Sequence, residues 1–232
     1  MDMRTYNFLE GEVLLINKPY GWTSFDVVNK IRCQLKHILK IKKIKIGHAG
    51  TLDPLATGLL ILCTGKFTKQ IDKYQAFEKE YTGSFYLGAT TPSSDLESAV
   101  DKIYDVTHIT SEMIYKASEK FIGEIAQRPP IFSAKKIDGE RAYEYARRGD
   151  DLLMDKKTVH IFSFEITGIK LPEVTFRVVC SKGTYIRALA RDFGEALGSG
   201  AYLSALCRTR IGDFLLENAM GLDEFQNQIG EI

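Results

Sequence analysis

The sequence has few of the features by which several protein classes are recognised. Among its 232 residues are only four cysteines, none of them in a C-x-x-C pair, which argues against a disulfide framework and a cysteine zinc site. We therefore expect all four to be small buried residues (Cys33, Cys63, Cys180 and Cys207). The longest nearly apolar run, Leu59 to Cys63, is too short to cross a bilayer, and no signal peptide precedes it. These absences predict a cytoplasmic protein without a membrane partner.

Histidine pairs with metal-ligand spacing are also absent, so we expect no bound metal. The formal net charge of +1 hides a polarised distribution, because residues 1–79 carry 13 lysines and arginines against 7 acidic residues. Between Lys30 and Lys45 lie seven basic residues and no acidic one. Residues 80–120 reverse the sign, with 7 acidic residues against 3 basic ones. One face could therefore bind an anion although the whole chain is nearly neutral.

Hydrophobic periodicity predicts a chain of mixed strands and helices. Alternating or buried runs predict strands at 12–17, 59–64, 81–87, 160–170 and 174–181, and helical spacing predicts helices after Thr23, from 113 to 121 and from 186 to 198. Strict βαβ alternation is absent and consecutive strands are spaced as hairpins. This pattern favours an α+β fold with a mixed, mainly antiparallel sheet flanked by helices. Without a linker or repeat, we expect a single domain over residues 1–232.

The densest motif is GHAGTLDPLATG at residues 47–58, a glycine- and proline-rich loop that contains one carboxylate, Asp53. A structural turn, in which Asp53 hydrogen-bonds its own backbone, is one interpretation. The basic stretch upstream and His48, five residues before the aspartate, favour a functional loop. A nucleotide-binding P-loop is excluded, because the glycine spacing is six residues instead of four and Phe67 stands where Ser or Thr would hold Mg²⁺.

Three other segments combine aromatic rings with cations. CSKGTYIR at 180–187 ends a predicted strand and begins a predicted helix, and helix N-termini attract anions. QRPPIFSAKK at 127–136 and YEYARRG at 143–149 interleave aromatic and basic residues, a pattern that suits unstacked bases and phosphates. Taken alone, each segment also has a structural interpretation, namely core packing of Tyr185, a surface ion pair of Arg187 or a solvated charged helix.

Taken in order, the motifs of this chain resemble those of the TruB family of tRNA pseudouridine synthases. They are NKPYGWTS (17–24), GHAGTLDPLATGLL (47–60), KEY (79–81), LGAT (87–90), QRPPIFSAK (127–135), GERAYEYAR (139–147) and SKGTYIR (181–187). The resemblance runs from about Leu14 to Phe214 and is most specific around Asp53. It implies the pseudouridine synthase fold, with the active site in a central cleft.

The resemblance implies isomerisation of a uridine in the T loop of tRNA to pseudouridine, with the base flipped out of its loop and no metal or organic cofactor. It implies Asp53 as the catalytic carboxylate, Arg187 as the cation that pairs with it, and Tyr81 as the aromatic residue that stacks on the uracil. Cleavage of the N-glycosidic bond develops positive charge at ribose C1′, which an ionised carboxylate can attack or stabilise. The same carboxylate could attack the uracil ring instead, and both routes remain open.

Further residues match positions that bind the substrate in the family. We expect His48, Tyr185, Lys18 and Leu206 near the base, and Lys42, Lys43, Lys45, Arg128, Lys135 and Arg147 at RNA phosphates. The expected partner is the T-arm of tRNA, bound in a salt-dependent manner. The resemblance also implies a monomer that needs no other protein.

Two features depart from the family pattern. Family members commonly carry a C-terminal PUA domain that grips the tRNA, and we expect none here because the chain stops at Ile232. Phe132 stands where a tyrosine is usual, and PSSDLES at residues 92–98 lacks the usual final glycine. The alternative function is an RNA-binding or tRNA-folding module with incidental catalysis, because base flipping and basic grooves would look the same in it.

Overall fold

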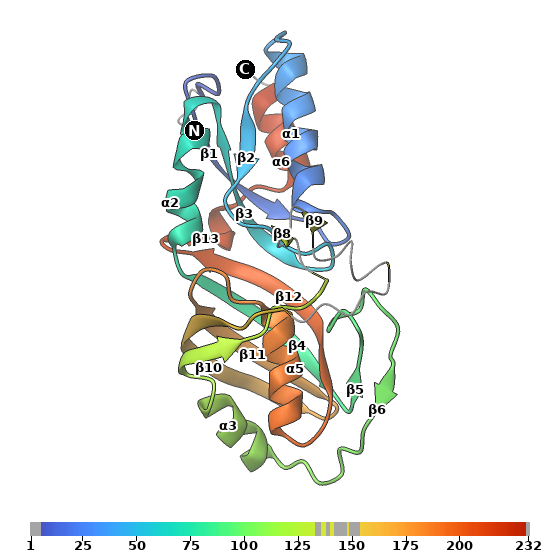
Figure 1. Cartoon of the computed structure of the whole chain (residues 1–232). Coiled ribbons are helices and arrows are strands. Elements are labelled where there is room, and N and C mark those ends of the chain that lie inside the picture. Colours follow the sequence, from blue (N-terminus) through green and yellow to red (C-terminus); the bar gives the residue numbers. More distant parts are fainter. Residues whose placement is uncertain (1–5, 133–135, 138–139, 142–147, 149–153, 231–232) are drawn as a thin grey trace. The chain divides into compact units, whose positions relative to one another are not determined.

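The structure, a computed structural model, describes residues 6–132, 136–137, 140–141, 148 and 154–230, which fall into two compact units (Figure 1). The first unit comprises Met1–Tyr81 and Cys207–Ile232, and the second comprises Thr82–Leu206. Among the described residues, no helix is long and apolar enough to cross a membrane.

The first unit is built around strand β3 (Thr57–Thr64), whose residues are almost all buried. Strand β1 (Val13–Lys18) pairs antiparallel with one edge of β3. The other edge is shared by β2 (Ile46–His48), which is antiparallel, and by the end of β12 (Ala201–Ile211), which is parallel. The remaining elements of this unit are α1 (Ser24–Ile38), η1 (Gly65–Gln70), α2 (Ile71–Ala76), β13 (Phe214–Leu215), η2 (Leu216–Asn218) and α6 (Leu222–Gly230).

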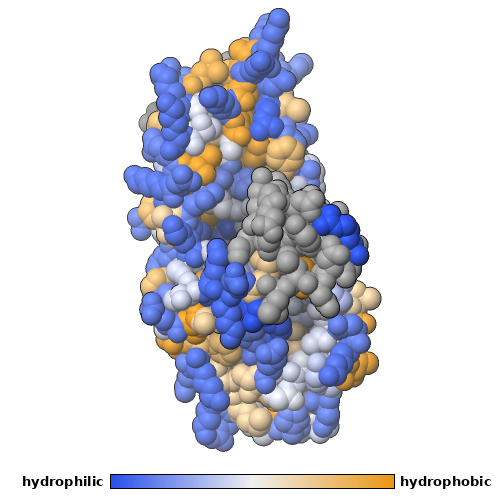
Figure 2. All heavy atoms as spheres, viewed as in Figure 1, coloured by the Kyte–Doolittle hydropathy of each residue, from blue (hydrophilic) through white to orange (hydrophobic). Residues whose placement is uncertain are grey.

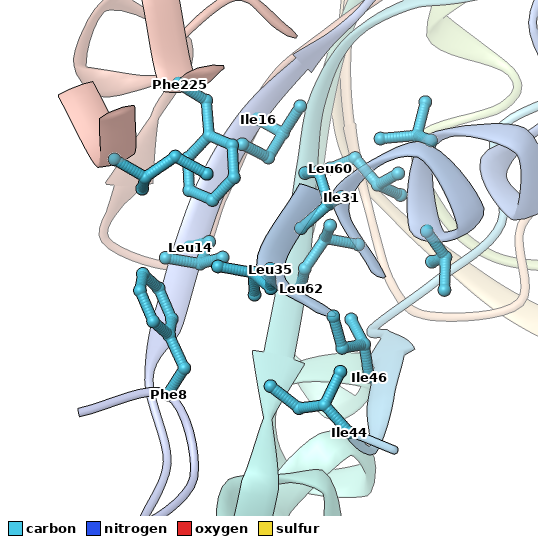
Figure 3. Packing of buried hydrophobic residues seen from close by; sticks show 13 residues of the cluster. Phe8, Leu14, Ile16, Ile31, Leu35, Ile44, Ile46, Leu60, Leu62 and Phe225 are labelled. Atoms are coloured by element: carbon cyan, nitrogen blue, oxygen red, sulfur yellow. The ribbon is translucent and has the colours of Figure 1, made fainter. Parts of the chain in front are cut away.

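Helix α1 begins at Ser24 because the preceding residue, Thr23, forms a capping box with Asp26. The Thr23 hydroxyl accepts from the Asp26 N–H at 3.0 Å, and the Asp26 carboxylate accepts from the Thr23 N–H at 2.9 Å. The apolar residues of α1 recur at helical spacing and bury one face of the helix. Figure 3 shows this face in a cluster with β1, β3 and α6 that includes Phe8, Leu14, Ile16, Ile31, Leu35, Ile44, Ile46, Leu60, Leu62 and Phe225.

The second unit contains a sheet in the order β12–β4–β11–β10–β7. Strands β10 (Lys157–Lys170) and β11 (Glu173–Cys180) form an antiparallel hairpin, and β7 (Gly123–Gln127) pairs antiparallel with the start of β10. Strand β4 (Lys79–Leu87), like β12, contributes residues to both units. The other elements are β5 (Ala89–Thr90), β6 (Lys102–Ile103), α3 (Ser111–Glu119), β8 (Lys136–Ile137), β9 (Glu140–Arg141) and α5 (Ile186–Ala196).

Aromatic packing fixes helix α5 on the sheet of the second unit (Figure 1). The rings of Phe85 and Phe176, from neighbouring strands, stack with their centroids 4.2 Å apart. Phe193 of α5 packs against Phe85 at 5.5 Å and against Phe164 at 5.6 Å. Aromatic pairs at such distances stabilise a core beyond the area that they bury. The orientation of α5, and hence of its N-terminus, is therefore set by the core.

The expected α+β fold with a mixed sheet is confirmed, and β12 with β3 is a parallel pair within it. The predicted strands and helices are all present, with their ends shifted by a few residues. The interpretation of the cysteines was wrong for Cys33, which lies on an exposed position of α1, and for Cys207, which is half-buried at the start of the first unit's part of β12. The single domain over residues 1–232 stays a prediction.

Candidate active site

The loop that carries Asp53 joins β2 to β3 in the first unit and is tied to the start of α1. The Leu52 N–H donates to the Ser24 hydroxyl at 2.8 Å, and the same hydroxyl donates to the Leu52 carbonyl at 3.1 Å. Both residues are buried, so this reciprocal pair is shielded from water. The Gly21 N–H also donates to the Pro54 carbonyl at 2.9 Å. Asp53 itself is half-buried between these two attachments.

Arg208 of β12 holds the same loop from the opposite end of the chain. Its side chain is fully buried, and its Nε donates to the Leu59 carbonyl at 2.8 Å. Its two Nη atoms donate to the carbonyls of Gly50 at 3.0 Å and Thr51 at 3.3 Å. Gly58 permits this approach, because a Cβ there would lie 2.4 Å from the Arg208 carbonyl oxygen and its φ is +103°. No pattern in the sequence predicts a buried arginine here, so sequence reasoning missed this residue.

Lys18, the last residue of β1, lies under the loop with no exposed surface. Its ammonium donates to three backbone carbonyls, those of Pro19 at 3.0 Å, Trp22 at 2.5 Å and Pro54 at 3.2 Å. Three donors match the three hydrogens of a protonated lysine. The bond to Pro54 attaches the residue after Asp53 to the β1–α1 connection.

Two opposing effects set the charge of Lys18. Burial lowers the pKa of Lys18 to about 8, and Arg208 lowers it further by repulsion. The attraction of Asp53, with a smaller contribution from Asp26, raises the pKa and opposes both. Lys18 and Asp53 therefore interact electrostatically within the first unit. The role of Lys18 in substrate binding stays a prediction.

His48, the last residue of β2, pairs with Leu62 and immediately precedes the loop. Burial lowers the pKa of His48, and repulsion by Arg208 lowers it further. Its imidazole is consequently neutral at neutral pH. The Nδ1 atom is buried and has no hydrogen-bond partner among the described residues.

Tyr81 is the last residue of the first unit and lies in β4 with 8% of its surface exposed. Its neighbour Glu80 is anchored, because the Thr209 hydroxyl donates to its carboxylate at 2.8 Å. The first unit thus contains Asp53, Lys18, His48 and Tyr81 of the predicted site.

The second unit contains the other two central residues, Arg187 and Tyr185. Arg187 lies in the first turn of α5, and its Nε is 3.5 Å from the carboxylate of Asp95. Its Nη atoms donate to the carbonyls of Ser93 at 3.2 Å and Phe132 at 2.8 Å. The surface pair considered from the sequence is thus a buried one. The expected pairing of Arg187 with Asp53 stays a prediction.

Asp95 is a second residue that we missed. It lies in the segment 92–98 that departs from the family pattern, and it is buried. A carboxylate that follows two polar serines is no sign of burial, because aspartate is mostly exposed. Its backbone forms an isolated bridge with Leu203, which fixes the segment beside β12.

The remaining predicted residues differ in their surroundings. Leu206 in β12 is half-buried, and Tyr185 precedes α5 and is half-buried. Lys42, Lys43 and Lys45 are exposed on the α1–β2 connection, which is covered by hydrophilic side chains at the top of Figure 2. Arg128 donates instead to the Met154 carbonyl. Lys135 and Arg147 lie outside the described residues.

No group of three or more histidine, cysteine, aspartate or glutamate side chains in the described part of the chain could hold a metal ion. The buried cations Lys18 and Arg208 contact backbone carbonyls of the loop that carries Asp53. The arrangement offers one carboxylate on a loop held from both sides, which suits attack on, or stabilisation of, an electron-poor carbon.

The chain is similar to one known family and to several known proteins. Residues 36–186 match the family described as "TruB family pseudouridylate synthase (N terminal domain)". "tRNA pseudouridine synthase B" of Phocaeicola vulgatus is 55% identical over 231 residues, which cover 97% of this chain and 98% of that protein. The protein of the same name from Flavobacterium johnsoniae is 54% identical over 228 residues, which cover 98% of this chain and all of that one.

Solved structures with the same fold are more distant. A chain in "Crystal Structure of a Cbf5-Nop10-Gar1 Complex" is 30% identical, with a TM-score of 0.70 over 95% of this chain. One in "Structure of H/ACA RNP bound to a substrate RNA containing 2'-deoxyuridine" is 29% identical, with a TM-score of 0.68. The present chain spans only about half the length of these two solved chains, 54% and 53% respectively.

Proposed function

The chain belongs to the TruB family of pseudouridine synthases and isomerises uridine in tRNA to pseudouridine, and we propose that Asp53 is the carboxylate that catalyses this reaction in the T loop. One observation carries the proposal. The backbone on both sides of Asp53 is held by hydrogen bonds from the buried side chains of Ser24, Lys18 and Arg208. A loop with a single carboxylate that is restrained in this way is organised before the substrate binds.

The reaction exchanges one bond for another within the same nucleoside. The N1–C1′ bond breaks, a C5–C1′ bond forms, N1 gains a proton and C5 loses one, so that no atom is added or removed overall. Asp53 can attack ribose C1′, or it can add to the uracil ring and release it later. Both routes need a carboxylate held at a fixed place relative to the nucleoside, which is the role that we assign to Asp53.

The other site residues would bind the flipped base. Tyr81 would stack on the uracil, and stacking on an aromatic ring contributes about 1–3 kcal/mol per base. This is comparable with the few kcal/mol that flipping costs. His48, neutral and with a buried Nδ1 that has no partner in the described part of the chain, would line the same space with Tyr185 and Leu206. Arg187 would pair with Asp53.

The exposed lysines Lys42, Lys43 and Lys45 would contact phosphates of the T-arm, as would Arg128, Lys135 and Arg147. Each such contact steepens the fall of affinity with salt. The two solved structures are described as complexes, one with other proteins and one an RNP bound to a substrate RNA. We propose that this shorter chain acts instead as a cytoplasmic monomer, without metal or cofactor.

The experiment that tests the proposal is incubation of a T-arm stem-loop RNA with the wild-type protein and with Asp53→Asn, followed by mapping of pseudouridine at each position. We expect a single modified uridine in the T loop with the wild type and none with Asp53→Asn. Equal product from both proteins would refute the role of Asp53.

The alternative, an RNA-folding module with incidental catalysis, is separated by a second measurement. Asp53→Asn protein is mixed with misfolded tRNA, and recovery of the native tRNA is measured. Recovery at the wild-type rate would add a folding activity that does not depend on catalysis. Loss of both activities would leave isomerisation as the only function.

A further inference from the structure

Helix α5 begins without a cap in the second unit. The side chain of its N-cap residue, Tyr185, makes no capping hydrogen bond, and the first turn contains no acidic residue. The N-terminal N–H groups of a helix attract anions, and the helix dipole adds to this attraction. Helix α5 has eleven residues, so its peptide dipoles add up to a helix dipole. An uncapped helix end does not by itself identify a binding site.

Gln127 supplies the second observation. This residue ends β7, is 2% exposed, and accepts a hydrogen bond from the Tyr185 N–H through its Oε1 at 2.8 Å. Because a backbone N–H can only donate, the oxygen must face Tyr185, and this assigns the other amide atom as Nε2. Nε2 is buried and has no partner among the described residues. An amide held at a helix N-terminus therefore presents an unmatched donor.

The charges around this amide favour an anion. Lys182 is exposed on the turn that leads into α5. Gly183, in the same turn, has a φ of +82°, and a Cβ there would meet nothing within 4 Å, so the turn borders open space. The buried carboxylate of Asp95 is engaged by Arg187, which lies in the first turn of α5. A phosphate group accepts hydrogen bonds, so it would be bound by N–H donors that have no protein acceptor.

We propose that Gln127 Nε2 and the N-terminus of α5 bind one backbone phosphate of the RNA substrate. The identity of the anion as an RNA phosphate rests on the proposed function, whereas the presence of an anion site rests on Gln127 and α5 alone. Free inorganic phosphate has the same chemistry, so the experiment compares the two sources.

The test uses Gln127→Glu in the full chain. Glutamate keeps the oxygen that accepts from Tyr185, replaces the amide donor with negative charge, and is favourable at a helix N-terminus. Position 127 is buried, so the new charge costs stability that the helix dipole offsets only in part. In protein that circular dichroism shows to be folded at the assay temperature, we expect the affinity for a T-arm stem-loop to fall about tenfold or more. A role in folding alone would leave the affinity of the folded protein unchanged.

Lys116→Gln is the matched control, because it changes the net charge by the same amount at an exposed position of α3. We expect its RNA affinity to stay within about twofold of the wild type. Unchanged affinity in folded Gln127→Glu, or an equal loss in the Lys116→Gln control, would overturn the proposal.

A second arm keeps the proposal testable if Gln127→Glu fails to fold. A set of T-arm RNAs, each with one uncharged methylphosphonate linkage at a different position, is bound to the wild type and to Gln127→Met. This substitution removes the Nε2 donor together with the oxygen that accepts from the Tyr185 N–H, and it adds no charge. At one position, the methylphosphonate should lower the affinity of the RNA for the wild type about tenfold. The same RNA should bind Gln127→Met as tightly as the unmodified RNA does. If no linkage shows this coupling, there is no RNA phosphate at Gln127. Stabilisation of the wild type by inorganic phosphate, without any coupled linkage, would assign the site to free phosphate and refute the RNA contact.

Failure of this proposal can be distinguished from failure of the proposed function. Pseudouridine formation by the wild type, together with unchanged RNA binding by Gln127→Glu, would refute only the phosphate site. Binding that depends on Gln127, without pseudouridine formation, would refute only the proposed catalysis.

Discussion

The carboxylate of Asp95 lies 3.5 Å from the guanidinium of Arg187, and both side chains are more than nine-tenths buried. The attraction between buried charges offsets the cost of removing them from water only while both are present. Asp95→Asn should therefore lower the free energy of unfolding by about 3 kcal/mol. Urea denaturation measures this loss, and Glu165→Gln, in an exposed pair with Arg177, is the control that should change little. Wild-type stability in Asp95→Asn would contradict a net contribution from the pair.

The hydrogen bonds of Arg208 to the Asp53 loop predict a selective loss of turnover. Arg208→Lys keeps the positive charge but cannot reach all three carbonyls, so the loop loses part of its restraint. We expect kcat to fall about 100-fold with a smaller change in KM, because misplacement of a catalytic group slows the chemical step. Arg210→Lys in the same strand, where the arginine pairs with Glu78, should retain most of the activity. A change confined to KM would place Arg208 in RNA binding instead.

The pKa of Lys18 predicts how activity depends on pH. Below about pH 8 the ammonium donates to three carbonyls, and above it the neutral amine has only two hydrogens. The attachment of Pro54 should weaken there, so kcat of the wild type should decline above about pH 8. Lys18→Met has no titrating group and should be slower, with no decline centred at that pH. An identical alkaline decline in both proteins would exclude Lys18 as its cause.

The lowered pKa of His48 predicts a loss of stability in acid. Below the ordinary histidine pKa of 6.5 the unfolded chain binds a proton that folded His48 resists, so the free energy of unfolding falls with falling pH. Denaturant midpoints at about pH 7 and about pH 5.5 measure this change. His48→Gln should lose less stability over this interval than the wild type. Equal losses in the two proteins would show that His48 is not the group responsible.

Elements with local signals could be predicted from the sequence. The capping residues Thr23 and Asp26 mark the start of α1, and Gly198, with a φ of +67°, marks the end of α5. Strand β12 was missed because its sequence mixes apolar, small and basic residues, without a clean alternation. Its partner β3 lies far away in the chain, and only tertiary pairing makes this segment a strand.

The candidate site was predictable to a similar extent. Asp53, His48 and Lys18 stand in motifs with an unusual composition, and the structure gathers them in the first unit. Arg208 and Asp95 were not predictable, because charged residues are normally exposed. Their burial depends on partners that are remote in the sequence, namely the loop carbonyls for Arg208 and the α5 guanidinium for Asp95.

The most direct test of Asp53 catalysis is the single-turnover rate of pseudouridine formation at saturating tRNA, for Asp53→Asn and Asp26→Asn. Both substitutions remove one negative charge from the first unit, but Asp26 caps α1 on the surface. We expect Asp26→Asn to react within about tenfold of the wild type, since loss of a cap costs about 1 kcal/mol of stability. Asp53→Asn should bind tRNA and react at least about a thousandfold more slowly. A rate for Asp53→Asn close to that of Asp26→Asn would contradict the account.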